Sequence, residues 1–554
     1  MLLTNGSKIF DLKTLLIRIF YLTTLFCGTA NGKQVTPRVF YIDAISGKDS
    51  NTGHAVTAAW KTLDRVNAAV FYPGDQILFK SGQSWIGQLN PKGNGQLKKP
   101  ILIGKYGYGK KPSIAGNGVA NGTLYFHNQQ YWEVSDLEIT NYDAKEQQGQ
   151  ELSAWENGNH TTYVLPILPR QLVNKNKPKY GIYVTAEDVG EVSHLYFKNL
   201  EVHGVNGYIN QADELSKENG GIVFKVLGSE KPTYFNGILI DSCHIHDVDR
   251  TGILLVSSPW SKRTLLTNTN WVPSLNIVLR RNKLSKTGAN ALVVRVAKNP
   301  IIEYNLFDRC AIKGSGNAGF SFNTDNALWQ YNECRFTKAN VDDRDAGGID
   351  SDYKTKHTVL QYNYVHDNDY GMLVTGGPNN FNDSTIVRYN IFENDGKFAH
   401  PTHKKCVIRV SGSATNTQVY NNVIFLGADQ IDTKVVSHEV WKTSPDGTVY
   451  RNNIFYNLST NAYCDYEEST NNYFDTNLYF GNPIKNILFD ANGIYRDPLF
   501  VNNQKGVQKY HLRLGSPAFG TGHIIKNNGG RDFYGNLVDR DKAPNIGVYN
   551  GALK

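Results

Sequence analysis

Two aspartates, Asp350 and Asp352, stand two residues apart in a short strand-like segment of a 554-residue chain. Side chains at alternate positions of a strand point to the same face, and these two Cα atoms should lie about 6.6 Å apart. Neighbouring carboxyl groups raise each other's pKa, whereas nearby arginines lower it. Such a pair can supply both a proton donor and a base, so the spacing predicts acid–base chemistry here.

Charged and polar residues of neighbouring segments align with this pair. When the segments are aligned by their first apolar residue, Arg295 lies two strands to one side and Arg409 two strands to the other. Stacked strands lie about 4.8 Å apart, so we expect these arginines and the aspartate pair to form one catalytic patch. On the same line we predict three substrate-binding residues, Lys225, Asn323 and His438.

Acidic residues also precede the aspartate pair in a predicted turn. Asp343 and Asp345 should lie at the mouth of the same face. Together with Asp350 and Asp352 they can hold Ca²⁺, which prefers carboxylate oxygens. The alternative is a solvated turn, and a hydrolytic reaction at this patch would require no cofactor.

The elements that must position these residues repeat along the chain. A short phrase of an Asn followed by apolar residues recurs eight times, with 23 to 32 residues between successive Asn residues. Such elastic spacing is typical of a solenoid, here built from strands and turns. A buried Asn at each corner can bond the backbone of the next coil, so we predict a structural ladder. The ladder residues are Asn282, Asn305, Asn332, Asn363, Asn390, Asn422, Asn453 and Asn477.

Both ends of the chain carry further motifs of this kind. Near the start, Trp60-Lys61-Thr62-Leu63 precedes Pro73-Gly74-Asp75-Gln76, and near the end Asp497-Pro498-Leu499-Phe500 precedes Gly515-Ser516-Pro517-Ala518. This pattern resembles secreted bacterial proteins of the pectin-lyase-like superfamily. The resemblance implies an all-β, right-handed parallel β-helix solenoid with an N-terminal cap and loop insertions on the groove side. It does not fix the chemistry, because this fold carries several functions.

We therefore expect a signal peptide, a cap, a solenoid with insertions and a C-terminal segment. Trp260 and Trp271 of the second insertion are predicted to stack on sugar rings, or else to pack on the coil beneath. The predicted segments are a signal peptide at 1–30, the N-terminal cap and first coils at 31–85, the β-helix at 86–485 with insertions at 143–180 and 257–274, and a C-terminal capping segment at 486–554.

The N-terminal segment has the features of a secretory signal. Basic Lys8 and Lys13 precede the apolar run 19–26, and small residues follow it. We expect a secreted or periplasmic monomer, with lipid attachment at Cys27 as an alternative. The net charge of +8 favours an anionic partner but gives no sign of nucleic-acid recognition.

Three functions fit these residues. The first is a glycoside hydrolase, which needs a proton donor and a second carboxylate. The acids are similar to those of the polygalacturonase family, although only Asn323-Thr324-Asp325 and Asp342-Asp343 match its motifs in letters. The second is a polysaccharide lyase that uses Arg or Lys as a base, with Ca²⁺ bound to the acids. The third is a non-catalytic glycan-binding solenoid.

Histidines that follow the Asn corners are a separate feature. His366-Asp367 and the segment His244 to Asp247, which includes His246, are interpreted as polar turn groups. A metal-binding or catalytic role is the alternative for them.

Overall fold

The computed structural model describes residues 36–145, 178–207, 214–314, 316–337, 345–397, 406–501, 504 and 506–551. The fold described below belongs to one compact unit, Arg38–Lys554. Within the described residues, no helix is both long and apolar enough to cross a membrane.

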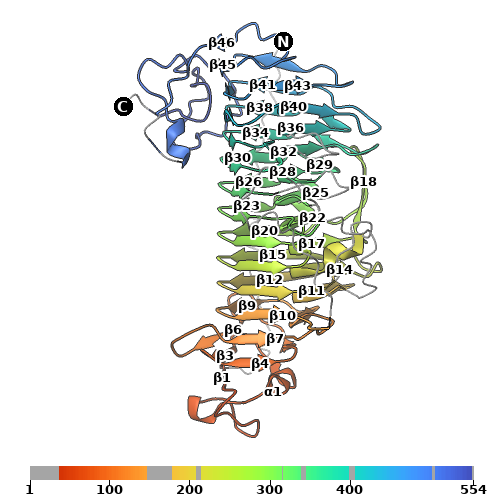
Figure 1. Ribbon diagram of the computed structural model, residues 1–554. Coiled ribbons are helices and arrows are strands. Elements are labelled where there is room, and N and C mark those ends of the chain that lie inside the picture. The colour runs from red at the N-terminus through yellow and green to blue at the C-terminus, as the bar shows by residue number, and fades with distance from the viewer. Residues whose placement is uncertain are drawn as a thin grey trace, which may run out of the picture. The chain divides into compact units, whose positions relative to one another are not determined.

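The coils of the solenoid build three parallel sheets, and from β8 (Leu124–His127) to β45 (Leu478–Gly481) each coil contributes one strand to each sheet (Figure 1). In the described part of the chain, the coils before β8 contribute only to sheets 2 and 3. Sheet 1 holds the strands that open each coil. Its strands are β8 (Leu124–His127), β11 (Tyr180–Glu187), β14 (Gly220–Leu227), β17 (Thr251–Ser257), β22 (Leu292–Lys298), β25 (Gly319–Asp325), β28 (Gly347–Ser351), β32 (Tyr370–Thr375), β36 (Cys406–Ser411), β40 (Lys434–Glu439) and β43 (Tyr463–Asp465), with the short side strands β29 (Thr355–Lys356), β33 (Asn382–Asp383) and β37 (Ala414–Thr415).

Sheet 2 follows sheet 1 within each coil and ends at the Asn corner. Its strands are β1 (Val39–Ile42), β3 (Gln76–Lys80), β6 (Ile101–Tyr106), β9 (Trp132–Ser135), β12 (Glu191–Lys198), β15 (Tyr234–Asp241), β20 (Leu275–Arg280), β23 (Ile301–Glu303), β26 (Leu328–Gln330), β30 (Val359–Gln361), β34 (Ile386–Arg388), β38 (Gln418–Tyr420), β41 (Val449–Arg451) and β44 (Tyr473–Asp475).

Sheet 3 follows the corner and completes the coil. Its strands are β4 (Ser84–Ile86), β7 (Ser113–Ala115), β10 (Glu138–Asn141), β13 (Glu201–Val205), β16 (His244–Val248), β21 (Lys283–Thr287), β24 (Leu306–Asp308), β27 (Glu333–Arg335), β31 (Tyr364–His366), β35 (Ile391–Glu393), β39 (Val423–Leu426), β42 (Ile454–Asn457), β45 (Leu478–Gly481) and β46 (Ile494–Tyr495).

Shorter elements decorate the coils. The insertion at 257–274 forms an antiparallel hairpin, whereas most of the insertion at 143–180 lies outside the described residues. The shorter elements are α1 (Leu63–Asn67), the 3-10 turns η1 (Val56–Ala58), η3 (Glu214–Glu218) and η4 (Gly506–Tyr510), the pair β2 (Val70–Phe71) and β5 (Lys92–Gly93), and the hairpin β18 (Ser261–Arg263) and β19 (Asn268–Trp271).

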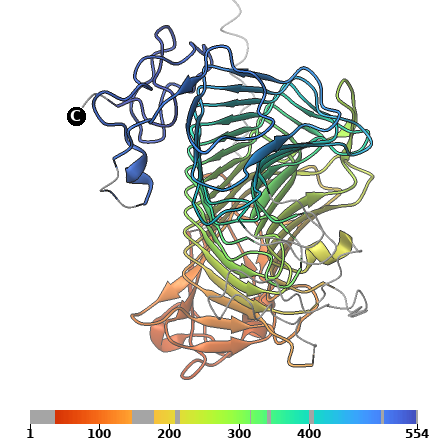
Figure 2. The same cartoon turned by 45° about the horizontal axis from the view of Figure 1, so that its top comes forward.

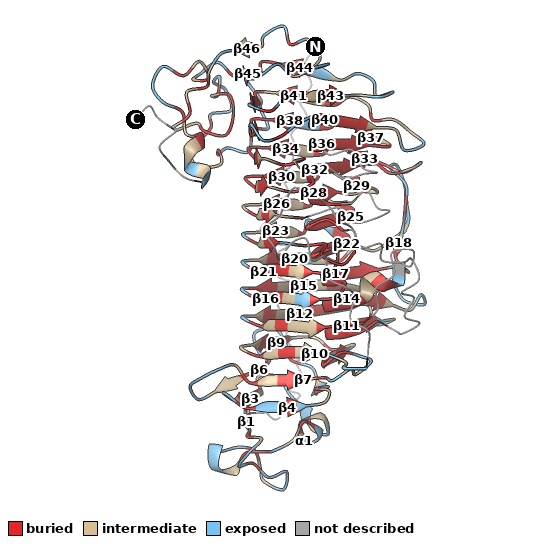
Figure 3. Cartoon of the chain, in the orientation of Figure 1, coloured by how far each residue is buried: buried red, intermediate tan, exposed pale blue. Residues whose placement is uncertain are grey.

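The fold is the right-handed parallel β-helix that the sequence predicted. Figure 2 shows the sheets wound around one interior. Alternate side chains point into it and form a continuous apolar core that runs from Phe40 to Tyr479. Large parts of the strands are buried (Figure 3) because parallel sheets bury their backbone polar groups as well as their apolar side chains.

The predicted Asn ladder is confirmed at the corner between sheets 2 and 3. The side-chain oxygen of Asn363 accepts bonds from the backbone and side-chain amides of Asn332, both at 3.0 Å. Its own Nδ2 donates to the carbonyl of Trp329 at 3.0 Å. Equivalent bonds join the ladder from Asn282 to Asn477, and the last Asn donates to Asp490. Each ladder Asn is therefore structural.

The residue before each ladder Asn turns the chain. Tyr304, Tyr331, Tyr362 and Tyr389 all have left-handed backbone, with φ between 50° and 56°. This conformation costs energy for a bulky residue, so the ladder bonds must compensate for it at every corner. Three of these rings stack in sequence along the outside, with centroids 4.8 and 4.9 Å apart.

The C-terminal segment packs along the side of the last coils. Phe500, Tyr510 and Val548 form an apolar cluster with residues of sheet 3, among them Ile391 and Val423. Figures 1 and 2 both show this segment beside the strands of the later coils. It therefore covers an outward face of sheet 3.

Removal of one rung should test the ladder. Asn363→Ala leaves two amide groups of Asn332 and the Trp329 carbonyl without their partner. We expect a loss of about 2–4 kcal/mol, because buried polar groups that lose a bond are costly. The measurement is the midpoint of chemical and thermal unfolding.

The control for this rung is Gln418→Ala at an exposed position of sheet 2. It should shift either midpoint very little. Equal stability of the two variants would contradict the structural role of the ladder.

Candidate functional site

Asp350 lies on β28 with its side chain on the outer face of sheet 1. The residue is 4% exposed. Its carboxyl oxygens accept bonds from the Thr375 hydroxyl at 3.0 Å and from Nδ2 of Asn317 at 3.2 Å. Burial raises its pKa well above the usual range, the negative charges of Asp352 and Asp345 raise it further, and Arg409 lowers it only in part. These surroundings therefore favour the protonated form of Asp350.

Asn317 is a buried residue that sequence reasoning missed, and it fixes the start of β28. Its side-chain oxygen accepts the amides of Ala346 at 3.1 Å and Gly347 at 2.7 Å, while its amide donates to Asp350. A side chain at Gly347 would collide with Leu373. Asn317 thus fixes both the start of β28 and the orientation of the Asp350 carboxyl group.

Asp352 lies just past the end of β28 and is half-buried. Its carboxyl oxygen accepts the amide of Tyr353 at 2.8 Å. The ring of Tyr353 contacts Phe322 edge-on at 4.8 Å and Trp441 edge-on at 6.1 Å. Trp441 is 43% exposed, so an aromatic surface adjoins this second acid.

Arg409 lies on β36 and is buried together with Tyr370, over whose ring its guanidinium lies at 5.0 Å. Burial lowers the pKa of Arg409, but Glu439, together with smaller contributions from Tyr370, Cys406 and Asp350, outweighs burial and raises the pKa. The Ser437 hydroxyl donates to the Glu439 carboxylate at 3.2 Å. Glu439 and Tyr370 belong to the charge network of this face, and sequence reasoning missed both.

Arg295 lies on the other side of the acids, on β22. Its guanidinium lies 5.1 Å from the ring of Phe322 and 5.7 Å from that of Phe320. Phe320 pairs with Asp350 in the next strand. Apolar rings therefore occupy the coil between Arg295 and the acids, next to an apolar patch of sheet 1 that includes Tyr183 and Val293.

The strand register corrects part of the predicted alignment. Arg295 pairs with Phe322, not with Asn323. Arg409 pairs with Leu373, which pairs with Asp350, so Arg409 shares the line of Asp350 rather than that of Asp352. The predicted register was wrong because β32 and β36 are buried on both faces, and such strands show no polar alternation.

His438 is the clearest consequence of that error. It points into the core, where its ring nitrogens bond the Ser469 hydroxyl at 2.7 Å and the Tyr450 hydroxyl at 2.9 Å. Burial lowers its pKa to about 3. His438 is a neutral core residue and lies outside the candidate site.

Lys225 and Asn323 are both engaged in bonds within the protein. Lys225 lies on the outer face, but its ammonium group bonds both carboxylate oxygens of Glu218 at 2.7 Å. It stands four strands from β28, which corresponds to roughly 19 Å. Asn323 is fully buried and donates to the Ser261 carbonyl at 2.7 Å, so it anchors the hairpin.

The two tryptophans of the hairpin region pack on the coils. Trp260 is buried in the main core. Trp271 donates to the Asn323 carbonyl at 3.4 Å and its ring lies 4.0 Å from the guanidinium of Arg263. Arg263 bonds Asp325 at 2.7 Å and so fixes the hairpin to sheet 1. The structure thus favours packing over sugar stacking for Trp260.

The candidate Ca²⁺ ligands are only partly described. Asp343 lies outside the described residues, whereas Asp345 is half-buried near Asp350. Among the described residues, the group of three possible metal ligands with donor atoms within 4.8 Å of one another lies on sheet 3 and does not include these acids.

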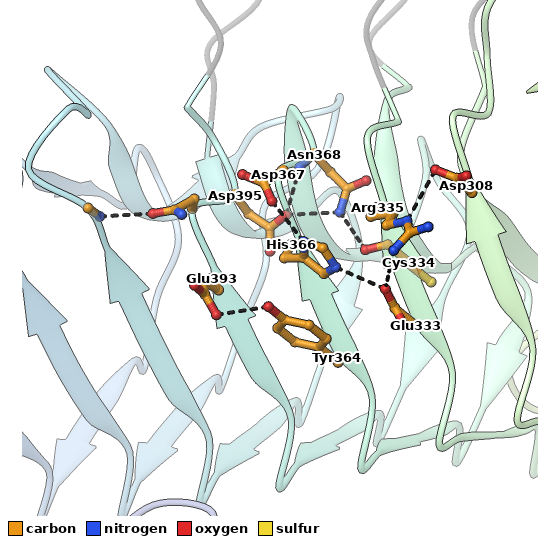
Figure 4. Close-up of polar contacts among 12 residues, drawn as sticks. Asp308, Glu333, Cys334, Arg335, Tyr364, His366, Asp367, Asn368, Glu393 and Asp395 are labelled. Carbon is orange, nitrogen blue, oxygen red and sulfur yellow. Dashed lines mark hydrogen bonds and ion pairs between the residues drawn. The ribbon is translucent and has the colours of Figure 1, made fainter. Parts of the chain in front are cut away.

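A second polar cluster surrounds His366 on sheet 3 (Figure 4). Its ring nitrogens bond Asp367 at 2.7 Å and Glu333 at 3.3 Å. Burial lowers the pKa of His366, but these two carboxylates outweigh it and raise the pKa to about 9. The ring is therefore a cation held between two anions, which favours a structural role. His366 is the last residue of β31, so only Asp367 lies in the predicted turn.

Beside His366, the corner between sheets 3 and 1 carries its own amide bonds. Asn368 donates to Asp395 at 2.9 Å and to the Cys334 carbonyl at 3.1 Å (Figure 4). Burial raises the pKa of Asp395 to about 8. At this corner, next to β28, a buried Asn thus bonds polar groups of the neighbouring coils, as the Asn residues of the ladder do.

The His366 cluster predicts a pH-dependent stability. The folded pKa of about 9 lies above the unfolded value of about 6.5, so the stabilisation is complete below pH ~6.5 and is lost as pH rises through 9. We expect His366→Gln to lose about 2–3 kcal/mol at pH 6 and much less at pH 10, as measured by urea unfolding. The exposed His54→Gln is the control. An equal loss at both pH values would contradict this assignment.

Comparisons with known proteins place the fold. No family model matches the chain. A lacto-N-biosidase of Bifidobacterium longum subsp. longum is 26% identical over 530 residues, covering 83% of this chain and 31% of that protein. The chain thus spans about a third of the length of this curated relative.

Two solved structures of the GH136 lacto-N-biosidase from Eubacterium ramulus resemble the chain. The native protein gives a TM-score of 0.51 at 20% identity, covering 73% of this chain and 66% of that chain. The selenomethionine derivative gives 0.52 at 19% identity, covering 80% and 67%. These likenesses support the parallel β-helix fold that the sequence resemblance implied.

Proposed function

We propose that the chain is a carbohydrate-active enzyme, a glycoside hydrolase that uses Asp350 and Asp352. The observation that carries this proposal is the buried Asp350, whose pKa is raised by burial, next to a second, more exposed carboxyl group. Two carboxyl groups whose environments push their pKa values apart are the usual acid and base of such enzymes.

The roles of the two acids follow from their surroundings. Asp350 would give its proton to the glycosidic oxygen, because burial disfavours its charged form. Asp352 is more exposed and would act as the base or the nucleophile. Asn317 and Thr375 bond both oxygens of Asp350 and would hold the carboxyl group in place.

The surface beside the acids suits a sugar. Aromatic rings stack on the apolar faces of sugar rings, and Trp441, Tyr353 and Phe322 form such a surface next to Asp352. We infer that this surface binds the sugar adjacent to the cleaved bond. Lys225, four strands away, would contact only a longer glycan.

The proposed substrate class comes from the relatives. Both are lacto-N-biosidases by name, so we propose a glycan that carries a lacto-N-biose unit as the substrate. Hydrolysis of such a bond requires no cofactor, and Ca²⁺ at Asp345, Asp350 and Asp352 remains a separate proposal. We also propose that the chain is exported, on the strength of the signal-like sequence at 1–30.

Substitution of the acids tests the catalytic assignment. We expect Asp350→Asn and Asp352→Asn each to lower kcat/KM on a p-nitrophenyl lacto-N-bioside by at least 10²-fold, with unchanged thermal unfolding. Asp429→Asn, at an exposed aspartate, is the matched control. Full activity in either acid variant would overturn the assignment.

The products separate the alternatives. Release of a free disaccharide identifies hydrolysis, whereas an unsaturated uronate would identify a lyase. Glycan binding without turnover on a panel of glycans would identify a non-catalytic solenoid.

Arg409 should shift the pH dependence of turnover. Activity needs protonated Asp350, so it should fall as pH rises through the pKa of that group. Arg409→Gln removes the positive charge that lowers this pKa and leaves Glu439 uncompensated. The alkaline limb of the kcat/KM profile should therefore move to higher pH, whereas Arg409→Lys should leave it nearly in place. A shift to lower pH would contradict this assignment.

A further inference from the structure

Two histidines stand at the same register on neighbouring strands of sheet 3. His203 on β13 pairs with His246 on β16. Their rings lie parallel, with an interplanar angle of 3° and centroids 4.8 Å apart. Their side chains are 27% and 18% exposed, so solvent reaches both rings. This pair lies several coils from β28 and on a different sheet.

Carboxylates face the same edge of both rings. Nε2 of His203 lies 2.9 Å from Oε1 of Glu138, and Nε2 of His246 lies 3.4 Å from Oε1 of Glu201. Glu138 pairs with Glu201 on the adjacent strand. In the strand register, both acids lie two positions before the line that His203 and His246 share. The donor atoms of Glu201, His203 and His246 lie within 4.8 Å of one another.

We propose that Glu201, His203 and His246 form a binding site for a zinc-class divalent metal ion. Imidazole nitrogen with a carboxylate suits Zn²⁺ and its neighbours among the transition metals, whereas Ca²⁺ prefers oxygen ligands alone. Bonds of about 2.0 Å in a tetrahedral site place donor atoms roughly 3.3 Å apart. Small side-chain rotations therefore close the site, and the carboxylate of Glu138 or a water supplies the fourth ligand.

Asp247 prepares His246 for this role. Its carboxylate bonds Nδ1 of His246 at 2.6 Å. A bond of this kind fixes the ring orientation and directs the lone pair of Nε2 toward a metal. The neighbouring His244 instead bonds the Ser285 hydroxyl at 3.3 Å and lies on the other line of the strand face.

The metal would join consecutive coils. The ligands come from β13 and β16, and Glu138 on β10 adds a third strand. A ligand that binds the folded state alone stabilises it in proportion to its concentration over its Kd. Zinc should therefore act as a clamp on these coils, in a manner independent of the acids on sheet 1.

The test uses the full chain, purified without a histidine tag and treated with a chelator. We expect isothermal titration with ZnCl₂ to show one saturable site per chain, and the thermal midpoint to rise with zinc concentration. His203→Gln and His246→Gln should each weaken this site at least tenfold and remove the thermal shift.

A matched control separates a built site from a simple ion pair. His194 on β12 makes the same kind of bond to Glu133, at 2.9 Å, but stacks on Tyr196 instead of a second histidine. His194→Gln should bind zinc like the unchanged protein. If either site variant unfolds, Glu201→Gln removes the carboxylate ligand on a surface position and should also weaken binding.

Two results would overturn the proposal. One is the absence of a saturable zinc site in the unchanged protein. The other is zinc binding that survives in folded His203→Gln or His246→Gln protein with the affinity of the His194→Gln control.

Discussion

The whole structure depends on pairing the backbone at the corner of each coil. A solenoid must turn sharply several times per coil, and each turn removes polar groups from water without a strand partner. Here a buried Asn at one corner bonds the next coil, from Asn282 to Asn477. A left-handed residue such as Tyr362 precedes each rung. The ladder thus holds successive coils in fixed register. This register decides which side chains lie next to one another on each face of the sheets.

Burial on the outer face of sheet 1 gives the candidate site its chemistry. Asp350 is buried on a strand whose start is set by Asn317, and this burial raises the pKa of its carboxyl group. Asp352, two residues on, is more exposed and bonds an amide. This short segment therefore places a buried and a more exposed carboxyl group two residues apart. Arg409 and Glu439 come from later coils. Arg409 lowers the pKa of Asp350, and the negative charge of Glu439 raises the pKa of Arg409.

The stacking of the coils also places chemically different groups of side chains on different sheets. The acids belong to sheet 1, whereas the histidine and glutamate line of His203 and His246 belongs to sheet 3. His366 lies on the same sheet, where two carboxylates outweigh burial and raise its pKa to about 9. His203 and His246 stand side by side and are more exposed to solvent than His366, so we propose that a metal replaces the protons of their rings.

The sequence by itself determined the fold and the Asn ladder and pointed to Asp350 and Asp352 as candidate acids, because repeats and paired acids are local patterns. It could not determine the register of β36 and β40, since strands buried on both faces lose their polar alternation. His438 therefore lies in the core and Arg409 joins the line of Asp350. Only the tertiary structure decided which partner each charge meets, because Asn317 and Glu439 reach the site through the stacking of coils.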